Sequence, residues 1–301
     1  MLDFKPITLE MLREFKKQPF PNDLRLCDYT PGCMALWSSS FNMRGCIRDC
    51  VLFCLSDPEP ETVPYSCYYT MPVCDEDGFD AALDIIAADA AESGRPLRFC
   101  CVPEEYIDRI KQHFGQPVEI SSNPTWSDYL YPYENFCGYK GKALHGQRNH
   151  VNRFTHEHPD YQFVPMTNEN ISLARRFMVE NRSEFDKDEA SAEAELANLN
   201  CIFDAFDALG LYGGLLFADN RLQGFTIGEP IGDTLHIHVE KSLTGFIGAY
   251  QVLAMCFAES MKSDRLIYIN RQDDAGDEGL RKSKQGYKPC KMLDKYNIIY
   301  S

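Results

Sequence analysis

The sequence predicts a mixed α/β protein made of two similar domains. The chain has 301 residues, enough for two domains of ordinary size. In its second half, helical and strand-like hydrophobic patterns follow one another in an order that requires both antiparallel and parallel strand pairs. The ends of the two halves also repeat one pattern, a strand, a short acidic helix and a tyrosine-rich strand, roughly 150 residues apart. An internal duplication explains all three observations.

The second half shows the clearer pattern of elements. Its helices begin at polar capping residues and end at glycine, and its strands alternate between turn residues. We expect strands at 161–165, 212–218, 222–229, 234–241, 266–270 and 295–300, and helices at 168–184, 190–209, 248–262 and 277–285.

The first half repeats this outline less clearly. We expect helices at 9–17, near 23–26, at 79–93 and at 103–114, and strands at 34–39, 50–55, 65–71, 97–102 and 128–131. Gly94 follows the alanine-rich helix at 79–93 as a helix terminator.

An antiparallel meander followed by a β-α-β unit is the order of elements in the second half. The β-α-β unit requires a right-handed crossover between parallel strands. This order resembles the acyl-CoA N-acyltransferase fold of the GCN5-related N-acetyltransferase (GNAT) superfamily. We therefore expect two tandem GNAT-like domains, at 1–137 and 161–301, joined by a basic linker helix at 138–160.

Composition restricts the classes of function. There are 30 Lys and Arg against 45 Asp and Glu, a formal charge of −15, which argues against general coating of nucleic acid and against docking on an anionic membrane. No apolar run reaches the length of a membrane span, and the N-terminus lacks the pattern of a secretory signal. We expect a cytoplasmic protein whose 13 cysteines are reduced and pack as small hydrophobic residues, with no CxxC pair for a zinc ribbon.

Polar residues gather after the strand expected at 266–270. Ligands of open α/β sheets bind beyond the carboxyl ends of strands, and Asn270 and Arg271 stand at such an end. Acidic residues such as Asp274 precede the following helix, and Arg281 and Lys282 lie within it. The segment predicts a functional site, although a short helix with charges matched to its dipole is an alternative.

Two histidines alternate with apolar residues in the strand at 234–241. By that alternation His236, His238 and Glu240 share one face and could bind zinc or relay a proton, or they could be satisfied inside the sheet. No third metal ligand is identifiable, so we expect no metal. Glu240 precedes the turn that opens the helix at 248–262, the pyrophosphate cradle of the GNAT fold. Gly245 and Gly248 occur there without the complete Gln/Arg-x-x-Gly-x-Gly/Ala pattern, which argues against ordinary use of acetyl-CoA.

The stretch 138–154 contains no acidic residue. As a helix from about Gly141, it places His145, Arg148, Asn149 and Asn152 on one side, and Lys142 is among its basic residues. This polar stripe could hold a phosphate-bearing ligand or an RNA end, or it could be a linker that neutralises acidic neighbours.

Four strings carry a resemblance to a known family. Residues 236–241, 248–251, 269–284 and 141–154 resemble the phosphatidylglycerol lysyltransferase C-terminal domain family over essentially the whole chain. The resemblance implies a tandem GNAT-like fold and transfer of an aminoacyl group from aminoacyl-tRNA to a lipid headgroup or a related acceptor. No counterpart of the transmembrane portion of the lipid enzymes is found in these 301 residues, so we expect a protein similar to the stand-alone branch of the family.

We therefore expect an acyl- or aminoacyl-transferase with its site in the second domain and no tightly bound cofactor. Its donor would be a small or phosphate-bearing molecule, aminoacyl-tRNA (bound through its acceptor end) or acyl-CoA. The alternatives are CoA-dependent N-acylation of a small amine and a non-catalytic ligand-binding relative. The expected catalytic residues are Glu240, Asp274, Asn270 and Lys282, and the expected substrate-binding residues are Arg271, Arg281, Tyr287, His236, His238, Lys142, Arg148 and Asn149.

Overall fold

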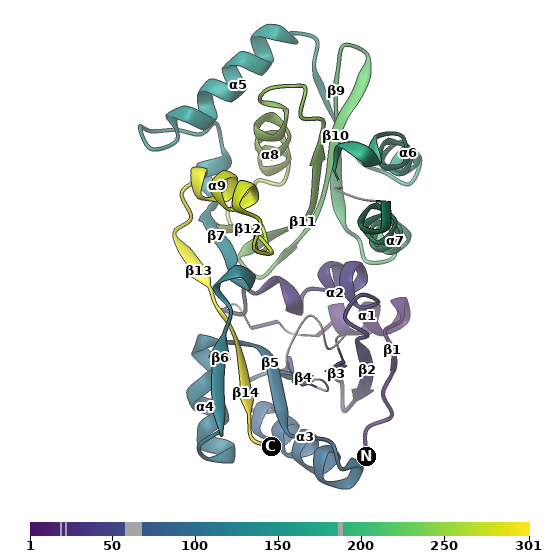
Figure 1. The fold of residues 1–301 in the computed structure, drawn as a ribbon, viewed down its shortest axis with the longest axis vertical. Coiled ribbons are helices and arrows are strands. Elements are labelled where there is room, and N and C mark those ends of the chain that lie inside the picture. Colours follow the sequence, from purple (N-terminus) through teal and green to yellow (C-terminus); the bar gives the residue numbers. More distant parts are fainter. Residues whose placement is uncertain (19, 22, 58–67, 186–188) are drawn as a thin grey trace. The chain divides into compact units, whose positions relative to one another are not determined.

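The computed structural model describes residues 1–18, 20–21, 23–57, 68–185 and 189–301 (Figure 1). They form two compact units. Unit 1 comprises Met1–Asp128 and Leu293–Ser301, and unit 2 comprises Tyr129–Met292. Within the described residues, each unit contains a seven-stranded mixed sheet. Expected strand 65–71 falls partly on residues 65–67, which lie outside the described residues.

The sheet of unit 1 has the strand order β1-β2-β3-β4-β5-β14-β6. Its parallel pair, β4 and β5, is connected through α3, and the other pairs are antiparallel. The strands are β1 (Lys5–Pro6), β2 (Arg44–Arg48), β3 (Val51–Ser56), β4 (Tyr68–Thr70), β5 (Arg98–Pro103), β6 (Glu119–Ser122) and β14 (Lys295–Ile299). The helices are α1 (Leu9–Lys16), η1 (Cys27–Tyr29), α2 (Pro31–Trp37), α3 (Phe79–Ser93), α4 (Glu104–Phe114) and η2 (Pro124–Trp126).

The sheet of unit 2 has the order β13-β7-β12-β11-β10-β9-β8. Here β11 and β12 form a parallel pair through α8, and α8 covers the face opposite to α6 and α7 (Figure 1). The strands are β7 (Asp128–Pro132), β8 (Gln162–Pro165), β9 (Tyr212–Ala218), β10 (Arg221–Ile231), β11 (Thr234–Ser242), β12 (Tyr268–Asn270) and β13 (Lys291–Leu293). The helices are η3 (Tyr133–Phe136), α5 (His145–Glu157), α6 (Ile171–Asn181), η4 (Arg182–Glu184), α7 (Glu189–Ala205), α8 (Ala249–Ser260) and α9 (Glu278–Gly286).

The two sheets exchange strands along the chain. β14, which follows the last helix of unit 2, lies between β5 and β6 in the sheet of unit 1. β7, which follows the elements of unit 1, pairs with β12 in unit 2. The repeated tails of the sequence are therefore real strands, and each completes the other half's sheet. The expected bounds at 137 and 161 run consecutively along the chain, whereas the compact units interleave. The two mixed sheets confirm the predicted mixed α/β class with two similar sheets.

Some expected elements are wrong or incomplete. The strand expected at 34–39 is instead part of helix α2, because Pro31 stands at the first helical position and the Thr30 hydroxyl accepts from Cys33 N–H. Residues 23–26 form no helix; the 3-10 helix η1 begins at Cys27. Strands β1, β2, β6 and β13 were not predicted from the sequence. Among the described residues, no helix combines the length and the apolar character needed to cross a membrane.

Candidate active site

The sheet of unit 2 opens where β11 and β12 part. The two parallel strands are paired only from Thr234↔Tyr268 to His236↔Asn270. β12 ends at Asn270, whereas β11 continues to Ser242. Side chains after these pairs therefore stand at the carboxyl end of the parallel pair, where α/β sheets bind ligands.

A β-bulge in β11 divides the predicted trio of His236, His238 and Glu240. β10 residue Ile227 is paired with Val239 and the next residue, Gly228, with Ile237, so that His238 is an extra residue in β11. His238 Nε2 lies 3.1 Å from the buried Glu229 Oε1 of β10.

Beyond the bulge the strand alternates again. Lys241 forms an ion pair with Glu195 of α7, so its neighbour Glu240 faces the other side of the sheet, which α8 covers (Figure 1). The expectation that Glu240 continues the face of the two histidines is therefore wrong. In the described part of the chain, His236 and His238 belong to no group of three side chains close enough to hold a metal ion.

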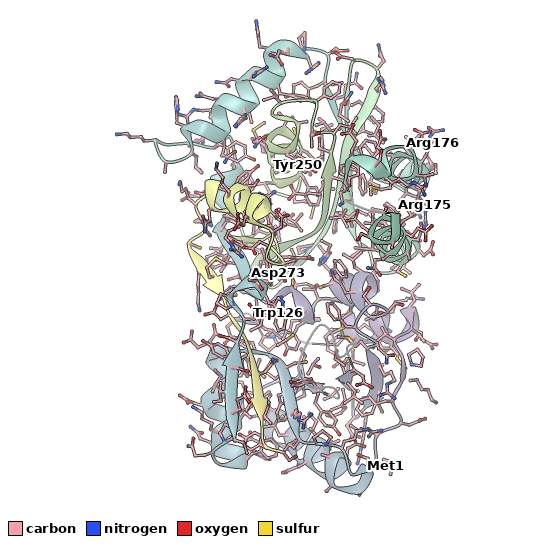
Figure 2. The ribbon with its side chains drawn as sticks, in the orientation of Figure 1. Met1, Trp126, Arg175, Arg176, Tyr250 and Asp273 are labelled. Carbon is pink, nitrogen blue, oxygen red and sulfur yellow. The ribbon has the colours of Figure 1, made fainter. Side chains whose placement is uncertain are left out.

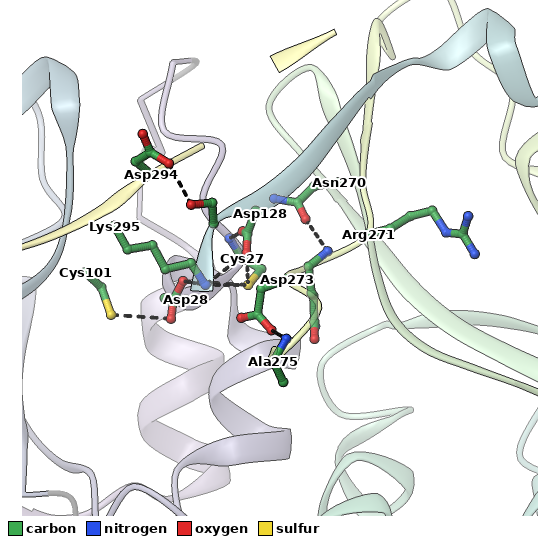
Figure 3. Close-up of polar contacts among 12 residues, drawn as sticks. Cys27, Asp28, Cys101, Asp128, Asn270, Arg271, Asp273, Ala275, Asp294 and Lys295 are labelled. Carbon is green, nitrogen blue, oxygen red and sulfur yellow. Dashed lines mark hydrogen bonds and ion pairs between the residues drawn. The ribbon is translucent and has the colours of Figure 1, made fainter. Parts of the chain in front are cut away.

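Glu240 forms an ion pair with Arg271, the first residue after β12. Arg271 Nε and Nη2 lie 2.7 Å and 2.6 Å from Glu240 Oε2, and the side chains are 9% and 11% exposed. The Arg271 guanidinium also lies over the Tyr287 ring, 4.4 Å from its centroid. Burial alone would lower the pKa of Arg271, but the Glu240 carboxylate raises it overall, so the guanidinium is always charged. Figure 3 shows Arg271 extending away from the loop that contains Asp273 and Ala275.

This pair has hydrogen-bonding capacity left over. Arg271 Nη1 is buried and has no hydrogen-bond partner among the described residues. Both contacts from Arg271 go to Glu240 Oε2, so Oε1 stays available for another donor. Thr226 of β10 is paired with Glu240 across the sheet, and its buried hydroxyl likewise has no partner within the described chain. A buried donor without a partner costs free energy, which a bound polar group would recover.

The loop after β12 is held from inside. Asn270 is fully buried, and its Oδ1 accepts from the N–H of Gln272, whose φ is +56°. Lys284 Nζ donates to the carbonyl oxygens of Arg271, Gln272 and Asp273 at 2.5, 3.3 and 2.5 Å. Sequence reasoning missed Lys284, which is 7% exposed although lysine is usually a surface residue. No local pattern in the sequence signals this burial, which depends on the three carbonyl groups of the folded loop.

Asp274 lies in the same loop and is saturated with hydrogen bonds. Its carboxylate accepts from Arg281 at two points, from the Tyr129 hydroxyl at 2.6 Å and from Gly276 N–H at 2.9 Å. The bonds from Arg281 above all lower its pKa to about 2. Asp274 is therefore ionised at neutral pH, with its oxygens engaged in holding the loop to α9 and β7.

The other predicted site residues differ in their exposure to solvent. Lys282 is exposed on α9, in contrast to Lys284, and Tyr287 is buried with its ring stacked on Phe136 at 5.3 Å between centroids. Lys142 and Asn149 are exposed around the start of α5, which begins at His145 rather than at Gly141.

Arg148 turns back to the chain that precedes α5. It donates to the carbonyl oxygens of Tyr139 and Gly141 at 2.6 and 3.1 Å. Helix α5 also meets the turn before α8, because the position a Gly248 Cβ would occupy is 2.2 Å from the His150 carbonyl oxygen. Tyr250, which Figure 2 labels, lies in the first turn of α8, two residues after Gly248 in the sequence.

Comparison with known proteins places the chain in a family. The family described as phosphatidylglycerol lysyltransferase, C-terminal, matches residues 27–299. A conserved protein of unknown function from Bacteroides thetaiotaomicron is 28% identical, with a TM-score of 0.87 and full coverage of both chains. L-PGS from Bacillus licheniformis is 15% identical, with a TM-score of 0.64 over 98% of this chain and 92% of that one.

A curated relative matches a smaller share of the chain. An uncharacterized protein of Mycoplasmoides gallisepticum is 23% identical over 173 residues, which span 57% of this chain and 56% of that relative. The family match, in contrast, includes every strand of both sheets except β1, and the whole loop from Arg271 to Tyr287. The chain belongs to the phosphatidylglycerol lysyltransferase C-terminal family.

Proposed function

We propose that unit 2 transfers an acyl group, most simply an aminoacyl group, from an activated donor to an amine or hydroxyl acceptor. The observation that carries this proposal is the buried Glu240–Arg271 pair at the parting of β11 and β12, with Arg271 Nη1 and Glu240 Oε1 uncommitted. Membership of a family named for lysyl transfer supports the aminoacyl group.

The two uncommitted atoms suit the two sides of an acyl transfer. Arg271 Nη1 would donate to the carbonyl oxygen of the donor and stabilise the negative charge that forms there when the acceptor attacks. Glu240 Oε1 would accept the proton that the acceptor's nitrogen or oxygen loses. Tyr287 would support this step, because its ring packs against the Arg271 guanidinium and holds the plane of the guanidinium in place.

Other predicted residues have supporting parts in this proposal. Asn270 and Asp274 hold the loop that carries Arg271, so we assign them to positioning and not to proton transfer. The exposed cations Lys142 and Lys282 and the exposed amide of Asn149 would contact phosphates of the donor. Aminoacyl-tRNA supplies such phosphates beside its ester bond.

Acyl-CoA is the second candidate donor, and one contact disfavours it. In a GNAT domain the turn before the crossover helix would cradle the pyrophosphate with its backbone N–H groups. Here that turn meets the His150 carbonyl at Gly248, so an oxygen of α5 faces the place where a phosphate would come closest.

The test is a transfer assay with purified protein and isotope-labelled lysyl-tRNA. Phosphatidylglycerol vesicles, a soluble amine and a peptide amine serve as separate acceptors, and labelled acetyl-CoA replaces the donor in a parallel arm. We expect product in one acceptor arm with the tRNA donor. Product from acetyl-CoA alone would mean that the donor is an acyl-CoA and not an aminoacyl-tRNA. The absence of product in every arm, also with other aminoacyl-tRNAs, would refute the proposal.

A matched pair of variants localises the chemistry. Glu240→Gln keeps the shape of the side chain and removes the proton acceptor, so we expect product formation to fall by about 100-fold or more. Glu195→Gln breaks the neighbouring ion pair on the opposite face of the same sheet and should leave the rate within about two-fold of wild type. Equal losses in both variants would place the chemistry elsewhere.

A further inference from the structure

A second cluster of reactive side chains lies in unit 1, whereas Glu240 and Arg271 belong to unit 2. It stands at the carboxyl end of the other parallel pair, because Cys100 is the last residue of β5 paired with β4 and Cys101 follows with a φ of +55°. Around it are Cys27 and Asp28 of η1, Asp128 and Lys295 (Figure 3). The proposed transfer uses none of these groups.

A lysine ammonium lies at the centre of this cluster. Lys295 Nζ is 2.7 Å from Asp28 Oδ2, 2.9 Å from Asp128 Oδ1 and 3.7 Å from Cys27 Sγ. Lys295 is 6% exposed and Cys27 is 3% exposed, so little water separates the amine from the thiol. The two residues are 268 positions apart in the sequence.

The backbone fixes both partners of the amine–thiol contact. Cys27 N–H donates to Asp128 Oδ2 at 2.8 Å, and Cys27 Sγ lies 3.4 Å from the other oxygen of that carboxylate. Lys295 starts β14 and is paired with Pro103 of β5. Burial raises the pKa of the Cys27 thiol well above its ordinary value, so the sulfur carries a hydrogen that points to a carboxylate.

The three groups could also hold a metal ion, since Cys27, Asp28 and Asp128 place ligand atoms within 4.8 Å of one another. The ammonium of Lys295 already contacts all three, however, and supplies the positive charge that a cation would bring. The contact between nitrogen and sulfur is the feature that a simple salt bridge does not require.

We propose that Lys295 and Cys27 form a covalent nitrogen–oxygen–sulfur bridge when the protein is exposed to dioxygen. The ammonium first gives a proton to a neighbouring carboxylate. The amine and the thiol then each lose two electrons to one dioxygen molecule. One oxygen atom becomes the bridge in Lys–NH–O–S–Cys, and the other leaves as water with the thiol hydrogen and one amine hydrogen. The oxidant is dioxygen because it is small and uncharged and can reach a buried sulfur.

The bridge has a structural consequence within unit 1. It would tie β14 covalently to η1 and close a loop that contains most of the chain, which restricts the unfolded state. An excess of dithiothreitol would reopen it, because sulfur bound to an electronegative atom is attacked by thiolates. Two molecules of the dithiol supply the four electrons and four protons that regenerate the thiol and the amine and release the bridging oxygen as water.

The experiment is intact-mass spectrometry of the full chain, purified without oxygen and then kept in air-saturated buffer or under argon. We expect the aerated protein to gain one oxygen atom and lose two hydrogen atoms, and dithiothreitol to reverse the change. After digestion, the peptides of Cys27 and Lys295 should be joined, with no tryptic cleavage at Lys295.

Variants and alternative masses decide the assignment. Lys295→Arg keeps the positive charge and Cys27→Ser keeps the size of the side chain, and both should abolish the change, whereas Cys33→Ser should retain it. Loss of two hydrogens alone means a disulfide, gain of oxygen alone means a sulfenic acid, and an unchanged mass in air means no bridge. Each of these three outcomes in the wild-type protein overturns the proposal, whether or not the variants fold.

Discussion

Arg281 donates two hydrogen bonds to the carboxylate of Asp274, with Nε 2.9 Å from Oδ2 and Nη2 2.9 Å from Oδ1. The carboxylate is 2% exposed, whereas the side chain of Arg281 is 36% exposed. A surface arginine of α9 thus fixes a buried acid of the preceding loop, and through it the position from which Arg271 reaches Glu240.

The first prediction concerns Asp274 and pH. Its pKa is lowered from 3.8 to about 2 in the folded protein, so the folded state favours the ionised form. That contribution to stability is complete above about pH 4 and is lost as the pH falls toward 2. Asp274→Asn should lower the free energy of unfolding by about 1–3 kcal/mol at pH 7. Urea unfolding at pH 7 and pH 3 should show a smaller difference between wild type and variant at pH 3; an equal difference would contradict it.

The second prediction compares two lysines of one helix. Lys284 donates to three backbone carbonyls, and Lys282 is exposed. Lys284→Met should destabilise unit 2 by about 1–3 kcal/mol, because it leaves buried carbonyls without a donor. Lys282→Met should change the stability by less than about 0.5 kcal/mol. Chemical denaturation monitored by circular dichroism measures both, and similar values for the two variants would rule out the internal role of Lys284.

The third prediction tests the contact between α5 and the turn before α8. Gly248 has a φ of +97°, and an added Cβ would lie 2.2 Å from the His150 carbonyl oxygen. Gly248→Ala should therefore destabilise the fold by about 2 kcal/mol or more. Gly245→Ala, three residues earlier, meets nothing within 4 Å and serves as the control. Thermal unfolding of both variants should separate them by several degrees.

The fourth prediction concerns the uncommitted nitrogen of Arg271. Arg271→Lys keeps a positive charge beside Glu240 but removes the fork that presents Nη1. If Nη1 stabilises the developing oxyanion, kcat should fall by about 100-fold or more while KM changes little. A rise in KM at unchanged kcat would instead assign Arg271 to ground-state binding.

Local signals in the sequence were sufficient for many elements of both units. The strand Tyr212–Ala218 and the helix Phe79–Ser93 occur at the predicted residues, because alternation, glycine stops and helical periodicity act within one segment. The candidate site at the end of β12 was predicted from polar residues after an apolar strand and stays a prediction; the structure pairs two of its residues, Glu240 and Arg271.

Other features depended on partners distant in the chain. The regular alternation through His236, His238 and Glu240 gave no sign of the bulge, which exists only in the pairing of β11 with β10. Lys284 is buried because three carbonyls of the preceding loop converge on it, a geometry no local pattern contains. The helix at Pro31–Trp37 had a local signal, Thr30 and Pro31, and the apolar residues after it obscured that signal.

The placement of β14 affects the order in which this protein becomes folded during translation. In the first sheet β5 and β6 are joined only through β14, so both of these pairings need residues 295–299. Unit 1 therefore cannot complete its sheet until the ribosome has made all of unit 2 and then β14. Unit 2 already has β7 when its own strands emerge. The half synthesised first is thus the half completed last.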